Sequence, residues 1–388
     1  MDNSLKNSLK NPDFRFRENE LARIAEVLAR RQSVLLTGIR RTGKTQVLKA
    51  ALVRHAEQGG LIGFLDVEDY VSLHDFYRDL LRRMPKTVLD NLTALLTEVR
   101  EVPDSLLSWL RRHVGKVKVN SVEVDFNPPG DDLPRYWQPV VERLEQVLRQ
   151  QEYSTLPVLG IDELPFMLEN LLARGVDPKE LTVMLAGLRK LRDAGLRLII
   201  AGSVSMENLL RLNNIPHTVL GGLWREDIPP FTEKEARDYL RERLAGSAAG
   251  GGSAMESILA QLPDYIPEFL DIATTEVRNC ADATACGTAM RERALPAIRR
   301  SFLTQFDERL VKNYPAAEQD IAEKILDTVA RAAPQGCRID GSALPSGYRQ
   351  VVLKLQYDNF IREGQDFNWQ FNLNLLRQSW RANRGMDQ

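Results

Sequence analysis

The chain has 388 residues, and its 52 Lys and Arg residues nearly balance 53 Asp and Glu, for a formal net charge of −1. This balance excludes a globally basic nucleic-acid binder, although it leaves room for a local basic patch. The length is sufficient for two or three domains. Four histidines without a paired metal spacing argue against a protein-bound zinc site. No apolar run approaches the ~20 residues of a membrane-spanning helix, so we expect no membrane partner.

Cysteine usage and the first residues suggest a cellular location. Cys280, Cys286 and Cys337 form neither an even disulfide set nor a C-x-x-C pair. We therefore expect reduced thiols and a cytoplasmic protein. Residues 1–13 are polar and lack the apolar core of a signal peptide, so we expect a flexible tail.

Residues 14–228 alternate short apolar segments with helical patterns, which predicts a parallel sheet covered by helices. We expect an amphipathic helix at residues 21–28 before the first strand. The expected strands are residues 33–38, 61–66, 156–162, 197–202 and 224–228.

An insert at residues 68–150 separates the second expected strand from the third. Its helical patterns cover residues 73–83, 87–99, 105–113 and 133–151. The alternating valines of residues 116–126 predict a hairpin or an edge strand, which residues 127–132 interrupt. This segment is either a sheet edge or a docking surface.

Residues 229–312 are expected to be helical. Thr232 and Glu235 have the S/T-x-x-E form of a capping box, and the Gly- and Ala-rich residues 245–254 predict a mobile loop. Residues 313–388 then read helix, helix, strand, turn, strand, helix. Their expected positions are residues 321–332, 347–357, 360–363, 364–366 and 367–372, with a closing helix after them. This order outlines a winged helix, with a small α+β cap as the alternative.

Residues 38–45 match G-x-x-x-x-G-K-[ST], the phosphate-binding loop of nucleoside triphosphatases. Gly38 and Gly43 let the backbone turn so that successive N–H groups face the phosphates. Lys44 brings a point charge to the β- and γ-phosphates, and the Thr45 hydroxyl can bind Mg²⁺. A strand before the loop and a helix after it point the helix N-terminus at an anion. The alternative is an ordinary Gly-containing turn. We assign nucleotide binding also to Arg40, Arg41, Thr42 and Gln46.

Two carboxylates end the apolar run of residues 157–161. Asp162 is expected to hold Mg²⁺ through water, and Glu163 to orient and polarise the attacking water. The alternative for both is a pair of solvated surface acids. Ser203 ends another apolar strand, where it is placed to sense the γ-phosphate or bind the attacking water, to cap a helix at residues 204–210, or to do both.

With these motifs, nearly the whole chain resembles the archaeal-type ATPases of the STAND group, which is related to the AAA+ ATPases. Residues 14–21 are similar to the family's upstream G-R-x-x-E segment, which packs against adenine and ribose. Phe16 replaces the usual Gly, so this match rests on Arg17 and Glu20. Residues 61–68 resemble the family's second strand, and residues 201–203 its sensor strand.

The resemblance implies further site residues. Arg225 lies where family members often carry an arginine, which implies a phosphate contact in cis or across a subunit boundary. A surface salt bridge is its alternative. Pro267 lies where the helical lid has G-x-P with the proline touching adenine, although Tyr265 replaces that Gly. Candidates for a lid arginine are Arg278, Arg291 and Arg293. Residues 372–380 resemble the closing helix of the winged domain.

These patterns predict an α/β P-loop fold of the AAA+/STAND type, with a helical lid and a C-terminal winged-helix domain. The expected boundaries are 1–13 (tail), 14–228 (core), 229–312 (lid) and 313–388. We expect a slow ATPase switch that uses ATP and Mg²⁺, in which Ser203, Glu163 and Arg225 distinguish ATP from ADP.

Three functions fit this fold. The first is a DNA-associated ATPase in mobile-element, replication or defence biology. The second is a signalling switch that binds a protein partner, with no nucleic acid and little turnover. A second copy of the chain is a candidate partner as well. The third, a small-molecule kinase, is disfavoured because Asp162 and Glu163 suit hydrolysis better. DNA binding would use the basic residues around the winged-helix outline, namely Arg338, Arg349, Lys354, Arg362, Arg377, Arg381 and Arg384.

Overall fold

The computed structural model describes residues 3–10, 16–84, 86–97, 133–150, 157–202, 205–246, 251–332 and 336–386. The expected helix at residues 105–113, the hairpin at residues 116–126 and Ser203 lie outside the described residues. The chain divides into two compact units. Unit 1 comprises Met1–Thr37 and Lys44–Asp227, and unit 2 comprises Gly38–Gly43 and Ile228–Gln388.

Unit 1 is built on a five-stranded parallel sheet in the order β2-β3-β4-β1-β5. All five predicted strands are confirmed. The central strands β3 and β4 are buried along their whole length, as expected for a parallel sheet covered on both faces. The strands are β1 (Ser33–Thr37), β2 (Ile62–Asp66), β3 (Val158–Asp162), β4 (Arg197–Ala201) and β5 (Leu223–Asp227).

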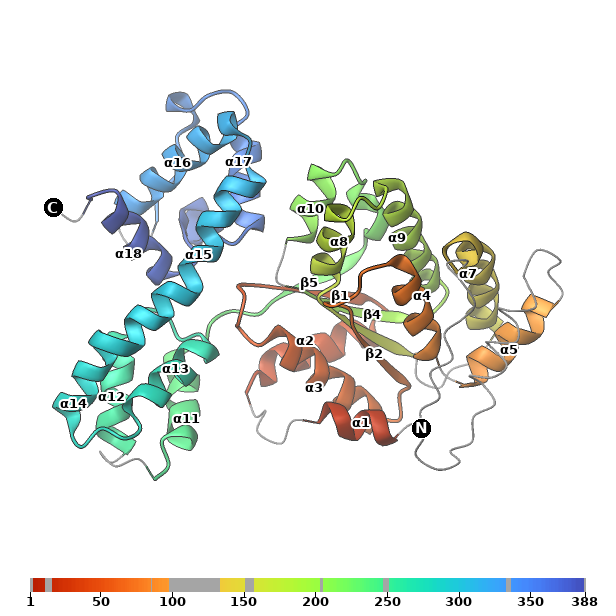
Figure 1. The fold of residues 1–388 in the computed structure, drawn as a ribbon, viewed down its shortest axis with the longest axis horizontal. Coiled ribbons are helices and arrows are strands. Elements are labelled where there is room, and N and C mark those ends of the chain that lie inside the picture. Colours follow the sequence, from red (N-terminus) through yellow and green to blue (C-terminus); the bar gives the residue numbers. More distant parts are fainter. Residues whose placement is uncertain are drawn as a thin grey trace. The chain divides into compact units, whose positions relative to one another are not determined.

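Helices cover both faces of this sheet (Figure 1). One side carries α1 (Asn3–Leu9), α2 (Glu18–Ala29) and α3 (Lys44–Glu57). The other side carries α4 (Leu73–Arg82), α8 (Leu164–Ala173), α9 (Pro178–Asp193) and α10 (Met206–Leu212), with the short 3₁₀ helix η1 (His217–Leu220) after them.

Two helices of the predicted insert, α5 (Lys86–Thr97) and α7 (Leu133–Gln150), pack on each other and extend the core. Trp137 of α7 is fully buried and stacks on Tyr77 of α4, with ring centroids 4.0 Å apart. Stacked aromatic pairs of this kind add to the stabilisation from burial alone. The insert helices are therefore part of the unit 1 core.

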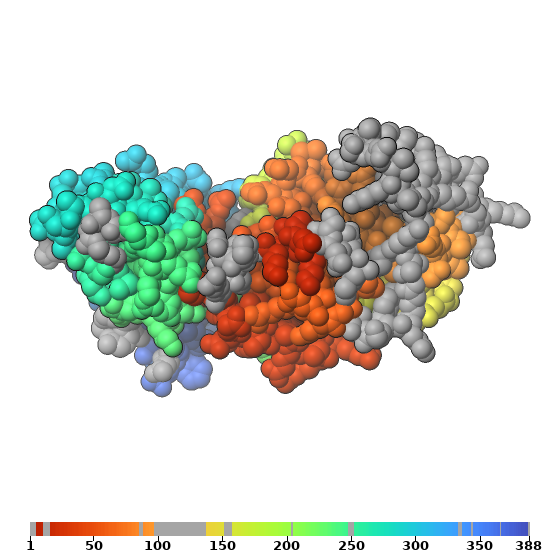
Figure 2. Space-filling model, turned by 90° about the horizontal axis from the view of Figure 1, so that it is seen from below, coloured from red at the N-terminus to blue at the C-terminus, as the bar shows by residue number. Residues whose placement is uncertain are grey.

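The N-terminal segment differs from the prediction of a flexible tail, because Asn3–Leu9 form the helix α1. This helix packs against α3, and Figure 2 shows it in red on the surface of unit 1. Leu9 is buried, and the Lys6 ammonium lies 3.7 Å from the Glu57 carboxylate. Leu5 and Leu9 are four residues apart and share one helix face, which the polar composition concealed.

Unit 2 begins with four helices, α11 (Glu233–Arg243), α12 (Gly251–Gln261), α13 (Pro267–Val277) and α14 (Ala283–Ala289). The predicted capping box is confirmed, since Thr232 and Glu235 bond each other's backbone at the start of α11. The prediction of a loop through residue 254 is wrong, because α12 already begins at Gly251. Ala254 is completely buried, so packing outweighs the low helix propensity of the glycines.

A π-helical turn, η2 (Met290–Ala294), leads from α14 into the long helix α15 (Leu295–Asn313). In Figure 1, α15 runs from the α11–α14 group to the last helices. No helix among the described residues combines the length and the apolar character required to cross a membrane.

The C-terminal part has the predicted order of two helices, two strands and a helix. These are α16 (Ala316–Arg331), α17 (Tyr348–Tyr357), β6 (Ile361–Glu363), β7 (Trp369–Phe371) and α18 (Asn374–Asn383), with the short helices η3 (Gly341–Ala343) and η4 (Gln365–Phe367). Strands β6 and β7 are antiparallel, with Arg362 opposite Gln370, which confirms the predicted hairpin. At its tip, Asp366 and Phe367 have positive φ angles of 57° and 59°.

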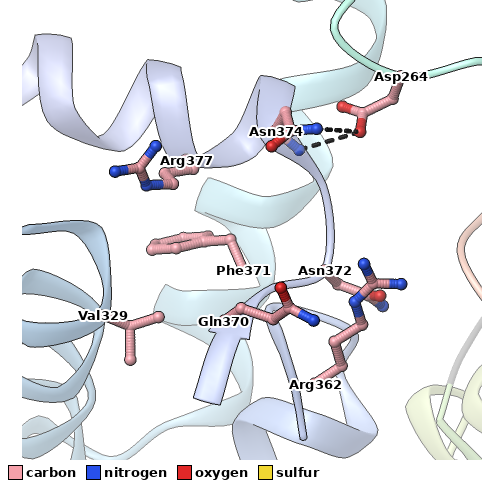
Figure 3. A pocket seen from close by; sticks show the side chains of 8 residues that line it. All are labelled: Asp264, Val329, Arg362, Gln370, Phe371, Asn372, Asn374 and Arg377. Atoms are coloured by element: carbon pink, nitrogen blue, oxygen red, sulfur yellow. Dashed lines mark hydrogen bonds between the residues drawn. The ribbon is translucent and has the colours of Figure 1, made fainter. Parts of the chain in front are cut away.

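Asp264, in the turn before α13, caps the N-terminus of α18 (Figure 3). Its carboxylate accepts the backbone N–H groups of Asn374 at 3.0 Å and Leu375 at 2.7 Å, and the Asn374 amide at 3.4 Å. Burial raises the pKa of Asp264, and these hydrogen bonds oppose the rise. A cavity of about 50 Å³ beside this cap is lined by Val329, Arg362, Gln370, Phe371, Asn372 and Arg377.

Candidate functional site

The loop Gly38–Gly43 connects β1 to α3, which begins at Lys44. Gly38 and Gly43 have φ angles of 125° and 92°, in the region where glycine carries no steric penalty. The buried Thr42 side chain donates to the Ile39 carbonyl at 2.9 Å and so closes the loop on itself. Glycine therefore occupies two loop positions whose φ angles would strain any other residue.

Thr45, in the first turn of α3, donates a hydrogen bond from its hydroxyl to the Asp162 carboxylate. Asp162 is the last residue of β3 and is 3% exposed. Burial raises the pKa of Asp162 to about 6, and the Thr45 hydrogen bond opposes this rise. The charges of Glu163 and Asp66 raise the pKa further, while Lys49 lowers it. The positive charge near the Asp162 carboxylate therefore does not offset its burial and the neighbouring acids.

This donor set fits Mg²⁺. A hydroxyl and a carboxylate are hard oxygen ligands, and Mg²⁺ commonly takes one or two carboxylates and keeps several waters. Asp66 lies opposite Asp162 in the β2–β3 register and brings a second carboxylate to the same sheet edge. Within the described residues, no group of three or more His, Cys, Asp and Glu side chains is arranged to hold a metal by itself. The prediction from sequence omitted Asp66, although it ends the expected strand at residues 61–66.

Glu163 has a left-handed backbone conformation, with φ 57° and ψ 29°. This conformation costs roughly 1–2 kcal/mol for a residue with a side chain, and such strain gathers at functional sites. It turns the chain sharply between β3 and α8, which begins at Leu164. Asp162 therefore ends β3, while Glu163 already stands at the N-cap position of α8.

The end of β4 packs closely on the start of α8. A Cβ built on Gly202 would lie 2.4 Å from Cδ of Pro165. Ser203 lies outside the described residues, but the alternative that it caps the following helix is wrong. Ser205 caps α10 instead, and its hydroxyl accepts the Asn208 N–H at 3.2 Å.

Arg225 and Arg17, the two arginines assigned by resemblance, both form ion pairs in unit 1. Arg225, on β5, pairs with Glu207 of α10 and remains partly exposed. In the structure Arg225 thus forms a surface salt bridge, which was the alternative to a phosphate contact. Arg17 is 3% exposed and lies 3.7 Å from the buried Glu20. Their contacts with a nucleotide remain predictions.

In unit 2, Arg41 forms an ion pair with Glu268 at 2.6 Å and donates to the Ser301 hydroxyl at 3.3 Å. Glu268 follows Pro267, the first residue of α13. Burial raises the pKa of Glu268, while the charges of Arg41 and Arg40 lower it. The prediction from sequence missed Glu268, whose only local signal is its place in a helix first turn.

Gln46 and the three candidate lid arginines each lie in a different environment. Gln46 lines a cavity of about 150 Å³ with Leu9, Leu21 and Ala50 of unit 1. Of the three candidate lid arginines, Arg278 is the C-cap residue of α13, and Arg291 donates to Thr288 at 3.4 Å. Arg293 bonds the Glu276 carboxylate at 2.7 Å.

No protein-family model matches the sequence, and no curated protein matches it either. Solved structures do match. The ORC2 protein of Aeropyrum pernix, in ADPNP–ADP complexes, is 12% identical, with 99% of each chain covered and a TM-score of 0.51. Cdc6p of Pyrobaculum aerophilum is 12% identical, with 100% of this chain and 98% of that chain covered and a TM-score of 0.39. AMPPCP-bound DnaA of Aquifex aeolicus is 10% identical, with 92% and 79% covered and a TM-score of 0.30.

The match to ORC2 concerns the fold and spans both chains almost completely. Together with the parallel sheet in the order β2-β3-β4-β1-β5, it confirms the predicted fold class. The chain has an α/β fold with a phosphate-binding loop motif between β1 and α3, and this fold is similar to that of the ORC2 protein.

Proposed function

We propose that the chain binds ATP with Mg²⁺ and hydrolyses it slowly, as a nucleotide-dependent switch. The observation that carries this proposal is the hydrogen bond from Thr45 to the buried Asp162 carboxylate. It joins the two motifs that a P-loop enzyme uses to hold its metal. The fold adds support, because the ORC2 structure that shares it was determined in ADPNP–ADP complexes.

Each site residue has a defined part in this proposal. The backbone of Gly38–Gly43 and the Lys44 ammonium bind the phosphates, with Arg40, Arg41, Thr42 and Gln46 alongside. Mg²⁺, held by Thr45 and Asp162, neutralises charge on the β- and γ-phosphates when it is bound. Glu163 orients the attacking water.

The same proposal assigns the nucleotide contacts that the resemblance implies. Ser203 and Arg225 distinguish ATP from ADP, while Arg17 and Pro267 contact the adenosine. Arg225 and Arg17 would have to serve alongside their ion pairs with Glu207 and Glu20, because both pairs are formed in the structure.

Isothermal calorimetry with MgATP and MgADP tests nucleotide binding directly. Lys44→Ala is expected to weaken MgATP binding by about 10- to 100-fold, the usual loss for a hydrogen bond to a charged group. Lys190→Ala is the matched control, since Lys190 pairs with Glu142 on the surface of unit 1 at 3.7 Å. Thermal melts check that both variants are folded. Absence of binding heat from the folded wild-type chain would contradict the proposal.

For the biological role, we propose first an ATPase linked to DNA through the C-terminal part. Four of the seven basic residues named from the sequence form ion pairs or hydrogen bonds within the C-terminal part. Lys354 is buried and pairs with Glu318, and Arg384 pairs with Glu323. Arg377 donates to the Ala332 carbonyl, and Arg381 donates to the Ala330 carbonyl. Arg338, Arg349 and Arg362 have exposed side chains, and Arg349 donates to the Tyr348 hydroxyl at 3.4 Å. We assign the DNA contacts first to these three arginines because of their exposure.

The second candidate is a signalling switch whose C-terminal part binds a protein partner. One observation favours it, namely that Phe367 at the tip of the β6–β7 hairpin is 75% exposed. Large exposed aromatic side chains are common anchors in protein interfaces. This alternative needs no nucleic acid.

Fluorescence anisotropy with labelled duplex DNA at several salt concentrations separates the two roles. DNA binding predicts an affinity that falls steeply with salt. Replacing Arg338, Arg349 and Arg362 together by Ala should flatten this dependence, while Phe367→Ala should leave it unchanged. ATPase rates with and without DNA add a second readout. A wild-type chain without salt-dependent affinity favours the protein partner.

A further inference from the structure

Two cysteines of unit 2 lie side by side. Cys280 follows α13, and Cys286 belongs to α14. The Val277 carbonyl accepts the Cys280 backbone N–H at 3.0 Å and lies 3.9 Å from Sγ of Cys286. The two thiols are hydrogen-bonded to each other, and both cysteines are free. Both cysteines therefore meet at the same backbone carbonyl, that of Val277.

A guanidinium lies beside one of these thiols. The Glu276 carbonyl accepts a hydrogen bond from Arg293 at 3.1 Å and lies 3.7 Å from Sγ of Cys280. Arg293 also contacts Cys280 directly. A neighbouring arginine stabilises negative charge on sulfur, and the thiolate is the reactive form of cysteine.

The two thiols differ in their access to solvent. Cys280 is partly exposed, whereas Cys286 is completely buried. Burial raises the pKa of Cys286, and the charge of Cys280 raises it further. Cys280 is therefore the sulfur that meets a reagent from solvent, and Cys286 is held behind it. This is the arrangement of an attacking and a resolving cysteine.

We propose that Cys280 and Cys286 form a reversible disulfide in response to hydroperoxide. The Cys280 sulfur attacks one peroxide oxygen, the O–O bond breaks, and water or an alcohol leaves. The resulting sulfenic acid is attacked by the Cys286 sulfur, which loses its proton as the second water departs. Two thiols have then lost two electrons to the peroxide. A dithiol reductant restores both thiols by exchange.

The disulfide would close the segment between α13 and α14. Pro267 and Glu268 belong to α13, so oxidation would restrain the helix that carries them. Intracellular disulfides are commonly transient and redox-sensing, which suits a fold without a structural disulfide among its described residues. The proposal does not depend on nucleotide binding.

Peptide mass mapping tests the proposal on the full chain. Arg278 and Arg291 flank one tryptic peptide, residues 279–291, which contains both cysteines. After hydrogen peroxide and alkylation of remaining thiols in denaturant, this peptide should carry no alkyl group and weigh two hydrogens less than its reduced form. Dithiothreitol should reverse the change. Met290 in the same peptide is no source of error, because its sulfoxide adds an oxygen.

Variants separate the two sulfurs and the arginine. Cys280→Ser should abolish the disulfide, whereas Cys286→Ala should leave a sulfenic acid on Cys280 that a cyclic dione traps. Cys337→Ser is the matched control and should oxidise like the wild type. Arg293→Ala should slow disulfide formation by about tenfold, with Arg293→Lys restoring much of the rate.

Three results would overturn the proposal. One is a folded wild-type chain in which the 279–291 peptide gains only oxygen atoms. Another is formation of the disulfide as fast in urea as in the folded chain, since the fold would then contribute nothing. The third is an unchanged rate in folded Arg293→Ala.

Discussion

The Thr45 hydroxyl donates a hydrogen bond to the Asp162 carboxylate, and this contact ties the first turn of α3 to the carboxyl end of β3. Asp162 is almost completely buried and lies near the charges of Glu163 and Asp66. One hydroxyl does not compensate a buried carboxylate surrounded by other acids. In the proposed function a divalent cation supplies that compensation, so the cost of burying Asp162 favours metal binding.

Glu163→Gln should separate binding from hydrolysis. The amide keeps the size of the side chain but cannot act as a base, so phosphate release should fall by about 10²–10⁴-fold. Affinity for MgATP should change little, because Glu163 is assigned to the water. Single-turnover phosphate release and calorimetry measure the two quantities. Glu169→Gln on α8 is the control, and wild-type turnover in Glu163→Gln would move the catalytic role elsewhere.

Asp162→Asn should stabilise the metal-free, nucleotide-free chain at neutral pH. The pKa of Asp162 is raised from 3.8 to about 6, so the folded state binds the proton more tightly than the unfolded state. The wild type therefore gains unfolding free energy as the pH falls from about 6 to about 4, and loses it as the pH rises through that window. At pH 8 the variant should exceed the wild type by up to about 2–3 kcal/mol.

Urea denaturation in EDTA at pH 8 and at pH 4.5 measures this difference. The stability advantage of Asp162→Asn should be large at pH 8 and small at the lower pH. Asp69→Asn, at an exposed carboxylate, is the control and should show no such change. If Asp162→Asn were more stable than the wild type by the same amount at both pH values, the buried charge of Asp162 would not be the cause of the difference in unfolding free energy.

The sequence sufficed to predict features that depend on local pattern. Apolar runs located the five strands, and the spacing of Gly38, Gly43 and Lys44 located the loop before α3, because these features are written in consecutive residues. The capping box at Thr232 is local in the same way. Even here the boundaries shifted by one or two residues.

Features that depend on distant residues were not predictable. Arg41 forms an ion pair with Glu268, and Asp264 caps a helix 110 residues away. The residues next to Arg41 and next to Asp264 in the chain carry no pattern that predicts these contacts. The start of α12 among glycines follows from the burial of Ala254 in a core formed by several helices. Tertiary packing decides such cases against local propensity.

Gly202→Ala should displace the start of α8. The new Cβ would lie 2.4 Å from Cδ and 2.7 Å from Cγ of Pro165, and a proline ring cannot rotate away. We expect a loss of about 1–3 kcal/mol in unfolding free energy. Because Glu163 lies two residues before Pro165, kcat should fall while nucleotide affinity is largely retained. Denaturation and steady-state kinetics measure these effects.

Gly252→Ala provides the matched control for this substitution. A Cβ at Gly252, in the first turn of α12, meets no atom within 4 Å. Replacing glycine by alanine at an open helical position is expected to stabilise by up to about 1 kcal/mol. If Gly202→Ala were as stable and as active as Gly252→Ala, close packing on Pro165 would not position Glu163.

Asp264→Ala should loosen α18 specifically. Its carboxylate accepts two backbone N–H groups at the start of that helix, and alanine leaves both without this acceptor. An unsatisfied cap costs about 1–2 kcal/mol, so hydrogen exchange in Asn374–Asn383 should accelerate by about 5- to 30-fold. Asp264→Asn keeps one acceptor oxygen and should lie between the wild type and alanine.

Asp282→Ala supplies a control for this last comparison, because Asp282 caps α14 from the adjacent position in the chain. Loss of that local cap should accelerate exchange in Ala283–Ala289 and leave α18 protected. The contrast isolates the long-range nature of the Asp264 contact. If Asp264→Ala accelerated exchange in α13 and left the amides of α18 as protected as in the wild type, the cap would not be what holds the C-terminal helix.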